Sequence, residues 1–165
     1  MKTQMGMVLN ETLRLYPPVV SMLRRTVCEM KVDVDKSSGR SMAIPAGTEV
    51  VLPILVWHHE AEYWGGDSGA HEFRPDRWSY YYGEGGMGGQ ESSVVGKQRG
   101  GAFIPFSMGP RACIGRTFAM LEAKSVMANV LRRFSFGISA AYRHAPVTVL
   151  TLQPQFGMPI VFHPL

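Results

Sequence analysis

One ten-residue segment, from Phe106 to Gly115, constrains this chain more than any other, because it follows the pattern F-x-x-G-x-R-x-C-x-G. It contains Cys113, one of two cysteines in 165 residues, between the glycines at 109 and 115. Glycine lets a backbone pass close to a large flat group, since no Cβ atom intervenes. Arg111 and the start of the helix that follows supply positive potential, which favours a thiolate. The segment therefore predicts a loop that presents a cysteine sulfur, with Phe106 shielding it from water.

The composition indicates a globular chain, with 45% hydrophobic and 18% charged residues. The net charge is +4, and no basic run is interleaved with aromatic residues, which argues against a nucleic-acid partner. Two cysteines do not make a disulfide framework. Cys28 lies in an apolar stretch and is predicted to be a buried thiol. The chain shows neither a signal peptide nor a run of about 20 apolar residues, so it is expected to carry no membrane anchor.

Periodicity predicts long helices over residues 4–16 and 114–134 and a short helix after Trp57. Alternation and turn residues predict strands over 31–35, 42–44 and 48–56, which would form one small antiparallel sheet, and a closing hairpin of 147–152 with 158–162. Eight glycines between 80 and 101 predict a flexible loop over 79–101. The expected fold is mainly α with small antiparallel β-sheets (α+β), with residues 1–165 forming a single partial domain.

Three other patterns are unremarkable when each is considered alone. Glu11 and Arg14 lie three residues apart on the first helix, where an exposed pair contributes about 0.5 kcal/mol or less. The neighbours His58 and His59 do not share a helix face and have no third ligand at a useful spacing, so structural histidines are favoured over a zinc site. The glycine-rich stretch has no strand before it and no helix directly after it, which argues against a nucleotide site.

Taken together and in order, these motifs resemble the haem-thiolate cytochrome P-450 monooxygenases of fungal or other eukaryotic type. The cysteine loop follows Glu11-Thr12-Leu13-Arg14, which continues into Leu15-Tyr16-Pro17-Pro18. Phe73-Arg74-Pro75-Asp76-Arg77-Trp78 lies between them. The cysteine loop is specific, whereas the other two elements gain weight from their order and spacing. The resemblance covers residues 5 to 162, and it corresponds to the C-terminal portion of such an enzyme.

The resemblance implies a role for each of these residues. Cys113 would be the axial thiolate ligand of haem iron. Five further residues would bind the cofactor, Arg111 through a propionate and either Arg24 or Arg25 through the second propionate. The implied haem-binding set is Cys113, Phe106, Gly109, Arg111 and Gly115, together with Arg24 or Arg25. The network of Glu11, Arg14 and Arg77 would be buried and structural, so that the loss of one partner costs several kcal/mol.

The substrate pocket implied by the resemblance is apolar. Its candidate residues are Val19, Val20, Met22, Phe156 and Met158. These side chains fit a role as ordinary core residues equally well. Two departures from the family pattern are mild: His59, Glu60 and Ala61 replace the usual residues after His58, and Asp76 replaces the commoner glutamate.

Two functions follow from this resemblance. The first is the haem-binding portion of a monooxygenase that inserts one oxygen atom from O₂ into an apolar small molecule, with electrons from an NADPH-dependent reductase. The second is a truncated, non-catalytic fragment with weak or no haem binding, because the oxygen-activating helix of the family is expected before Glu11. Isomerases or dehydratases that share the cysteine loop are a third possibility. No catalytic residue is assigned, and the endoplasmic reticulum membrane is expected for a full-length eukaryotic relative.

Overall fold

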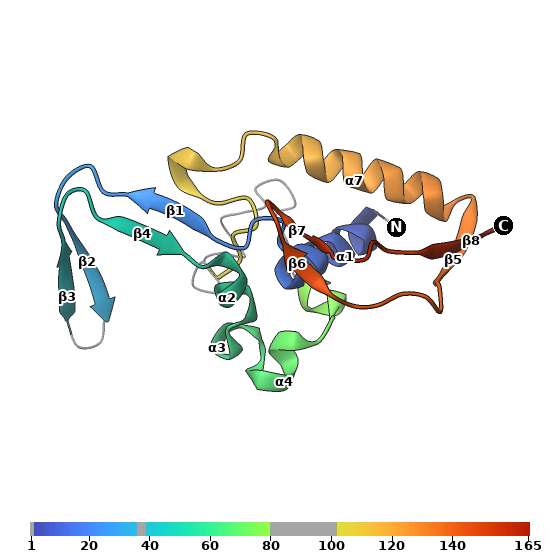
Figure 1. Ribbon diagram of the computed structural model, residues 1–165, viewed down its shortest axis with the longest axis horizontal. Helices are drawn as coiled ribbons and strands as arrows, with labels where there is room; N and C mark the ends of the chain where they lie inside the picture. The colour runs from blue at the N-terminus through green and yellow to red at the C-terminus, as the bar shows by residue number, and fades with distance from the viewer. Residues whose placement is uncertain (1, 36–38, 80–101) are drawn as a thin grey trace.

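The computed structural model describes residues 2–35, 39–79 and 102–165. Its helices and strands follow one another along the chain as shown in Figure 1. The helical elements are α1 (Lys2–Leu15), α2 (Ile54–His59), α3 (Ala61–Trp64), α4 (Gly66–His71), the 3₁₀ turns η1 (Pro75–Trp78) and η2 (Gly109–Arg111), and α7 (Arg116–Leu131). The strands are β1 (Met22–Arg25), β2 (Met30–Asp35), β3 (Arg40–Ile44), β4 (Glu49–Leu52), β5 (Phe134–Ile138), β6 (Pro146–Thr148), β7 (Leu152–Pro154) and β8 (Ile160–Pro164).

The strands pair in antiparallel twos, in agreement with the expected fold class of helices with small sheets. β1 pairs with β4 and β2 pairs with β3, and together they form an arm at one end of the molecule (Figure 1). At the other end, β5 pairs with β8, while the hairpin of β6 and β7 lies nearer the middle, beside α1 (Figure 1). The single sheet predicted over residues 31–56 is therefore wrong, since the described strands form separate pairs.

Two strand predictions need correction. The strand predicted over 48–56 ends at Leu52, because Pro53 follows it and α2 then begins at Ile54. The strand predicted over 158–162 does not pair with 147–152. It forms part of β8, which pairs with β5 immediately after α7, whereas β6 finds its partner in β7. Alternation identified these strands but not their partners, because pairing is settled by long-range contacts.

The well-buried core is small and aromatic, and it lies below α1 where α3, α4 and η1 meet. Trp64, Ala70, Trp78 and Ala102 form it, with Phe103 packed against them. The Trp78 and Phe103 rings are 4.5 Å apart between centroids, and the Trp64 and Trp78 rings 5.8 Å. Offset and tilted aromatic pairs of this kind add stability beyond their buried area. The core therefore fixes α3, α4 and η1 beside the N-terminal helix.

Other predictions are settled or left open by the described residues. Cys28 is exposed, which corrects the expectation of a buried thiol, because it lies in the connection between β1 and β2 rather than inside a sheet. Of the loop predicted over 79–101, residues 80–101 lie outside the described part of the chain. Across residues 2–35, 39–79 and 102–165, no helix is both long enough and apolar enough to cross a membrane.

Candidate functional site

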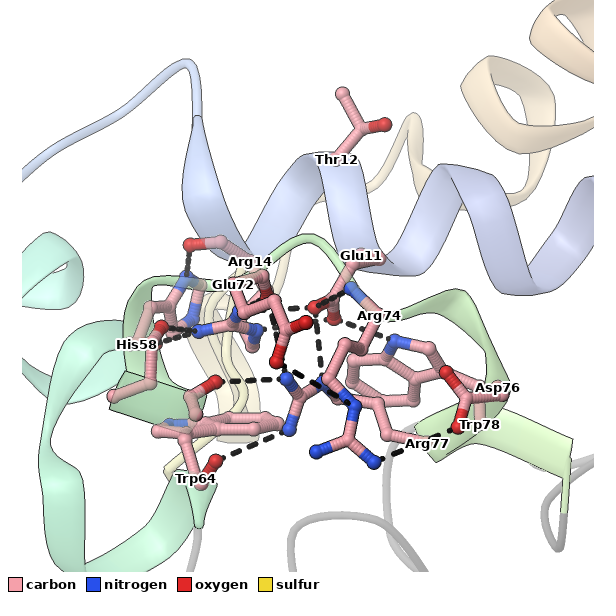
Figure 2. A network of polar contacts seen from close by, with 12 residues as sticks. Glu11, Thr12, Arg14, His58, Trp64, Glu72, Arg74, Asp76, Arg77 and Trp78 are labelled. Atoms are coloured by element: carbon pink, nitrogen blue, oxygen red, sulfur yellow. Dashed lines mark hydrogen bonds and ion pairs between the residues drawn. The ribbon is translucent and has the colours of Figure 1, made fainter. Parts of the chain in front are cut away.

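The centre of the structure is a buried carboxylate, Glu11, whose side chain is completely shielded from solvent. Its Oε1 accepts hydrogen bonds from Arg14 Nη2, from Arg77 Nε and from the backbone N–H of Arg74, each at 2.9 Å. Its Oε2 accepts from Arg14 Nε at 3.0 Å and from Trp78 Nε1 at 2.9 Å. Figure 2 shows these donors converging on the carboxylate from α1 and from η1 and the segment before it. Five donors on two oxygens satisfy the buried charge.

Arg14 is also completely buried, and it uses all five of its N–H donors. Three of its hydrogen bonds do not go to Glu11 but to backbone carbonyls. Nη1 donates to the carbonyls of His58 at 2.8 Å and Ala70 at 2.6 Å, and Nη2 donates to that of Glu72 at 3.1 Å. A guanidinium presents its donors in a fixed planar fork. Arg14 therefore fixes the backbone of α2 and of α4 relative to α1.

Arg77 joins the same network from η1. Besides its bond to Glu11, it donates to the backbone carbonyls of Trp64 at 3.1 Å, Gly69 at 2.9 Å and Glu72 at 3.3 Å. The structure thus brings together the three residues for which a buried network was expected. On spacing alone, an exposed pair was the better interpretation of Glu11 and Arg14. That interpretation fails because residues distant in sequence cover both side chains.

The electrostatics of Glu11 follow from this arrangement. Burial by itself raises the pKa of the carboxyl group, but hydrogen bonds from Arg14, from the Arg74 backbone and from Trp78 outweigh it, and the pKa is lowered overall. Glu11 is therefore ionised at neutral pH inside the protein. A buried carboxylate so fully paired with arginines and an indole is suited to holding segments together rather than to exchanging protons.

His58 connects this network to the segment that leads into the cysteine loop. Its ring is completely buried, with Nδ1 3.2 Å from the Arg14 carbonyl and Nε2 accepting the N–H of Ile104 at 3.0 Å. The neutral tautomer that fits donates from Nδ1 and accepts at Nε2. Burial lowers the pKa of His58 to about 4, so the ring is neutral at pH 7. His58 therefore joins α1 to Ile104, two residues before Phe106.

The cysteine loop is closed by its own backbone. The N–H of Cys113 donates to the Phe106 carbonyl at 2.8 Å, and the N–H of Ala112 donates to the Gly109 carbonyl at 3.0 Å. Gly109 has a φ of 71°, in the region that glycine adopts without strain. Cys113 is exposed and stands three residues before the first residue of α7. The structure thus presents the thiol at the end of a closed loop.

Of the other residues expected around the thiol, Phe106 and Gly115 are half-buried and the arginines are exposed. A Cβ atom added at Gly115 would lie 3.9 Å from Cys113 Sγ, which is an ordinary contact distance. Arg111 is exposed at the end of η2. Arg24 and Arg25 are both exposed on β1, where Arg25 Nε donates to the Gly47 carbonyl at 3.1 Å. Arg24 instead bonds within its own strand, to the Leu23 carbonyl at 2.9 Å and to Met22 Sδ at 3.3 Å.

One of the five candidates for a substrate pocket lies at a cavity of the described residues. Met158 lines an apolar cavity of about 410 Å³ between α1 and the C-terminal strands, whereas the other four do not line it. The Arg143 guanidinium instead lies over the Phe156 ring, with its Cζ 4.8 Å from the ring centroid. A backbone hydrogen bond of 2.8 Å from Leu152 N–H to the Pro18 carbonyl does bring β7 close to the chain just before Val19.

Two parts of the arrangement were not anticipated from sequence. Trp78 was expected in a compact turn, but its indole was not identified as a donor to Glu11. His58 was expected to be a structural residue, but its bridge to Ile104 was not foreseen. The signal for Trp78 was its position next to Arg77, since a 3₁₀ turn brings both side chains to the same carboxylate. No local signal identifies the His58 bridge, because its two partners lie 44 and 46 residues away.

Known proteins resemble this chain in sequence. The cytochrome P450 family model matches residues 4–158. Cytochrome P450 734A5 of Oryza sativa subsp. japonica is 46% identical over 161 residues, which are 98% of this chain and 26% of that protein. Cytochrome P450 72A15 of Arabidopsis thaliana is 45% identical over 161 residues, which are 98% of this chain and 28% of that protein. The 7-deoxyloganic acid hydroxylase of Catharanthus roseus is 42% identical over 159 residues, 96% of this chain and 27% of that enzyme.

The fold agrees with these sequence matches. The solved structure of retinoic acid bound cyanobacterial CYP120A1 superposes with a TM-score of 0.75 at 22% identity, covering 98% of this chain and 33% of that one. The chain belongs to the cytochrome P450 family, and the resemblance inferred from its motifs is confirmed. It spans about a quarter of the length of the curated plant relatives it matches.

Proposed function

We propose that this chain forms the haem-binding portion of a haem-thiolate monooxygenase, with Cys113 as the iron ligand. The observation that carries the proposal is the presentation of Cys113. Its thiol is exposed at the end of a loop closed by the Phe106 carbonyl. The segment that leads into this loop is held by the hydrogen bond from the Ile104 N–H to His58, which also contacts the buried network. A ligand must be held in position by its surroundings if it is to bind a metal rigidly.

The residues around Cys113 fit a haem. Ile114 and Phe118 are both highly exposed, 105% and 70% in relative terms, although they are large apolar side chains. Phe118 lies in the first turn of α7, directly after the loop. An apolar surface beside an exposed thiol suits a flat apolar ring with one iron ligand. When bound, the haem would supply the chemistry that inserts one oxygen atom from O₂ into an apolar organic substrate, with electrons from an NADPH-dependent reductase.

The arginines would hold the charged edge of the haem. We assign Arg111 to one propionate and either Arg24 or Arg25 to the other, because both of these arginines are exposed on β1. Arginine binds carboxylates through paired hydrogen bonds, which also fix the orientation of the ring. Phe106 would cover the sulfur, and Gly109 and Gly115 would allow the backbone to approach the ring. The buried network of Glu11, Arg14 and Arg77 would brace the loop through His58 and would take no part in the reaction.

The substrate would be an apolar small molecule. The name of one relative, 7-deoxyloganic acid hydroxylase, denotes a hydroxylation and is consistent with this reaction type. Val19, Val20, Met22, Phe156 and Met158 remain the proposed contacts. We extend the reductase partnership and the endoplasmic reticulum membrane only to a longer protein resembling the full-length relatives.

A second candidate function is that of a non-catalytic fragment with weak or no haem binding. The apolar face of α7 favours it. Phe118, Leu121 and Val126 are all more than half exposed, and exposed apolar area of this kind promotes association in water. A chain that aggregates through this face would not retain an ordered cysteine loop.

One spectroscopic experiment separates these functions. The 165-residue chain is reconstituted with haem, reduced and exposed to CO, and its absorption spectrum is recorded. A thiolate-type ferrous CO band that Cys113→Ala abolishes supports the proposal. The matched control is Cys28→Ala, since Cys28 is the other exposed cysteine and should leave the band unchanged. The absence of any Soret band from the wild-type chain would favour the non-catalytic fragment.

A further inference from the structure

Two histidines outside the network lie side by side, although they are 12 positions apart in the sequence. His59 is the last residue of α2, and His71 is the last residue of α4. Their ring centroids are 5.1 Å apart, and the ring planes make an angle of 59°. The tilt is too large for stacking of the two rings. The pair therefore brings four imidazole nitrogens into one small region.

The buried network holds this pair in place. Arg14 Nη1 donates to the carbonyls of His58 and Ala70, the residues immediately before His59 and His71. One guanidinium nitrogen thus fixes the peptide group that precedes each histidine. Because Arg14 is completely buried and fully bonded, both backbones are held at a set separation. The two rings are consequently positioned before any ligand arrives.

The rings line an open cavity that also contains acidic residues. Its volume is about 420 Å³, and Glu60 and Asp67 line it together with His59 and His71. Asp67 and His71 lie four residues apart on α4, so they share one face of that helix. The two imidazoles are the potential ligands in this space, and the two carboxylates add negative charge around it, which attracts a cation.

His59 itself has an unused nitrogen. Its Nε2 is buried and has no hydrogen-bond partner among the residues that the structure describes. Buried polar atoms are normally paired, so an orphaned one points to a missing ligand or solvent molecule. An imidazole nitrogen without a hydrogen-bond partner has a lone pair or a proton that a ligand can satisfy, and imidazole is a common metal ligand.

We propose that His59 and His71 together bind one divalent transition-metal ion of the Zn²⁺, Cu²⁺ or Ni²⁺ type. Two imidazoles on one tetrahedral ion with nitrogen–metal bonds of about 2.0–2.1 Å have ring centroids about 5.2 Å apart, and the observed separation is 5.1 Å. In residues 2–35, 39–79 and 102–165, no three His, Cys, Asp or Glu side chains are grouped closely enough to hold a metal. The site therefore has two protein ligands, water completes the coordination, and the nearby carboxylates add attraction. Imidazole ligands favour these ions over Mg²⁺ or Ca²⁺.

Titration of the tag-free chain with Zn²⁺, without haem, tests the site by competition with a chromophoric chelator. One equivalent should bind, and His59→Ala and His71→Ala should each weaken binding at least about tenfold. The matched control is His163→Ala on β8, which should bind Zn²⁺ as the wild type does. Failure of the wild type to bind, or unchanged affinity in both histidine variants, would overturn the proposal.

Two further measurements distinguish the histidine site from a thiol-bound ion and from a loss of folding in the variants. The double variant Cys28→Ala/Cys113→Ala should retain Zn²⁺ binding, whereas its loss would assign the ion to a thiol and overturn the proposal. Zn²⁺ should raise the melting temperature of the wild type but not that of His59→Ala, because an ion stabilises only the state that binds it. The quantity compared is the rise in melting temperature that Zn²⁺ causes in each protein. A variant with a lower melting temperature in the absence of Zn²⁺ therefore still tests the proposal. Haem binding at Cys113 can fail without affecting any of these outcomes.

Discussion

Two regions of this chain differ in whether their functional groups are paired inside the protein or exposed to solvent. Around Glu11, charged groups are completely buried, and each is satisfied by partners within the chain. Around Cys113 and along α7, a thiol and large apolar side chains are turned outward. We call the first region internally complete, because its charged groups already have hydrogen-bond partners within the chain and are not available to a ligand. The second leaves its groups free, which is what a surface for a cofactor or another polypeptide segment requires.

The comparison separates residues that hold structure from residues that bind. Perturbed ionisable groups often mark functional sites, but they also occur in structural ion-pair networks. Here Glu11 and His58 have lowered pKa values and lie in the internally complete region, whereas His59, whose pKa is also lowered, belongs to the proposed metal site. Exposure of groups that normally seek partners is the better guide to the binding region in this chain. The following experiments test that division through the free energy of unfolding.

The largest effect should come from Arg14→Met. Removing the guanidinium leaves the Glu11 carboxylate buried with an incomplete set of donors and takes the Arg14 donors away from the carbonyls of His58 and Ala70. Loss of one partner from a buried ion pair costs about 3–5 kcal/mol. Urea denaturation followed by tryptophan fluorescence measures it. Arg74→Met is the control, since the Arg74 side chain is 46% exposed and its ion pair with Asp76 is 3.6 Å long. A loss below about 1 kcal/mol for Arg14→Met would contradict a network that holds the fold together.

Lowering the pH should have the next largest effect. The pKa of His58 is about 4 in the folded protein, below its ordinary value of 6.5. Its contribution is therefore fully present above pH 6.5 and is lost as the pH falls towards 4, by about 3 kcal/mol. A second proton would place Nε2–H against the N–H of Ile104. Below pH 4.5 the lowered pKa of Glu11 adds a further loss.

Urea denaturation between pH 7 and 4 measures this dependence. His58→Gln should flatten the dependence of the unfolding free energy on pH between pH 6.5 and 4.5. The matched variant His59→Gln should retain most of the pH dependence, since His59 is less buried than His58. Equal slopes in the wild type and in His58→Gln would refute the assignment to His58.

Trp78→Phe should have a smaller effect, because it removes one donor and keeps an aromatic ring in the core. The lost bond is the one from Trp78 Nε1 to Glu11 Oε2. A hydrogen bond to a charged group contributes about 1.5–3 kcal/mol. Trp64→Phe is the matched control, since Trp64 Nε1 donates to the neutral Trp57 carbonyl at 2.9 Å. That variant should lose less, about 1 kcal/mol from the bond itself. Chemical denaturation of both variants gives the comparison, and a larger loss for Trp64→Phe would reverse the expected order.

Cys113→Ala should have the smallest effect on stability. The thiol is exposed, and the loop is closed by backbone atoms that the substitution leaves in place. Surface substitutions of this kind usually change stability by less than about 0.5 kcal/mol. Denaturation of the haem-free variant measures it. A loss comparable to that of Arg14→Met would mean that Cys113 belongs to the structural region rather than to the binding region.

The sequence predicted the two regions to different degrees. The cysteine loop was recognisable from its own ten residues, because glycine positions, an arginine and a cysteine at fixed spacing are local features. The network was not, since the spacing of Glu11 and Arg14 alone favours an exposed pair. Only the resemblance to a family indicated their burial, because the residues that cover them lie 44 to 67 positions away.

The same distinction accounts for the errors in the fold. Both long helices were predicted close to their observed positions, since a helix forms from local contacts and α1 ends just before Pro17-Pro18. The strand predicted through Val56 gave way to α2, whose Ile54 is buried in the assembled structure. The pairing of β8 with β5, and the adjacency of His59 and His71, depend on the whole chain. Neither leaves a periodic signal in the sequence.

Arg14 donates hydrogen bonds to the backbone carbonyls of residues 58, 70 and 72, and these bonds do not involve the side chains at those positions. This separates two kinds of constraint on residues 58–72. The number of residues between those carbonyls is constrained, because an insertion or deletion would move at least one of them out of reach of a rigid guanidinium. Side-chain identity at position 72 is not constrained by these bonds, and the Glu72 side chain is 62% exposed. Substitutions at position 72 should therefore be better tolerated than a one-residue change of length, whereas Ala70 is also constrained by its place in the core.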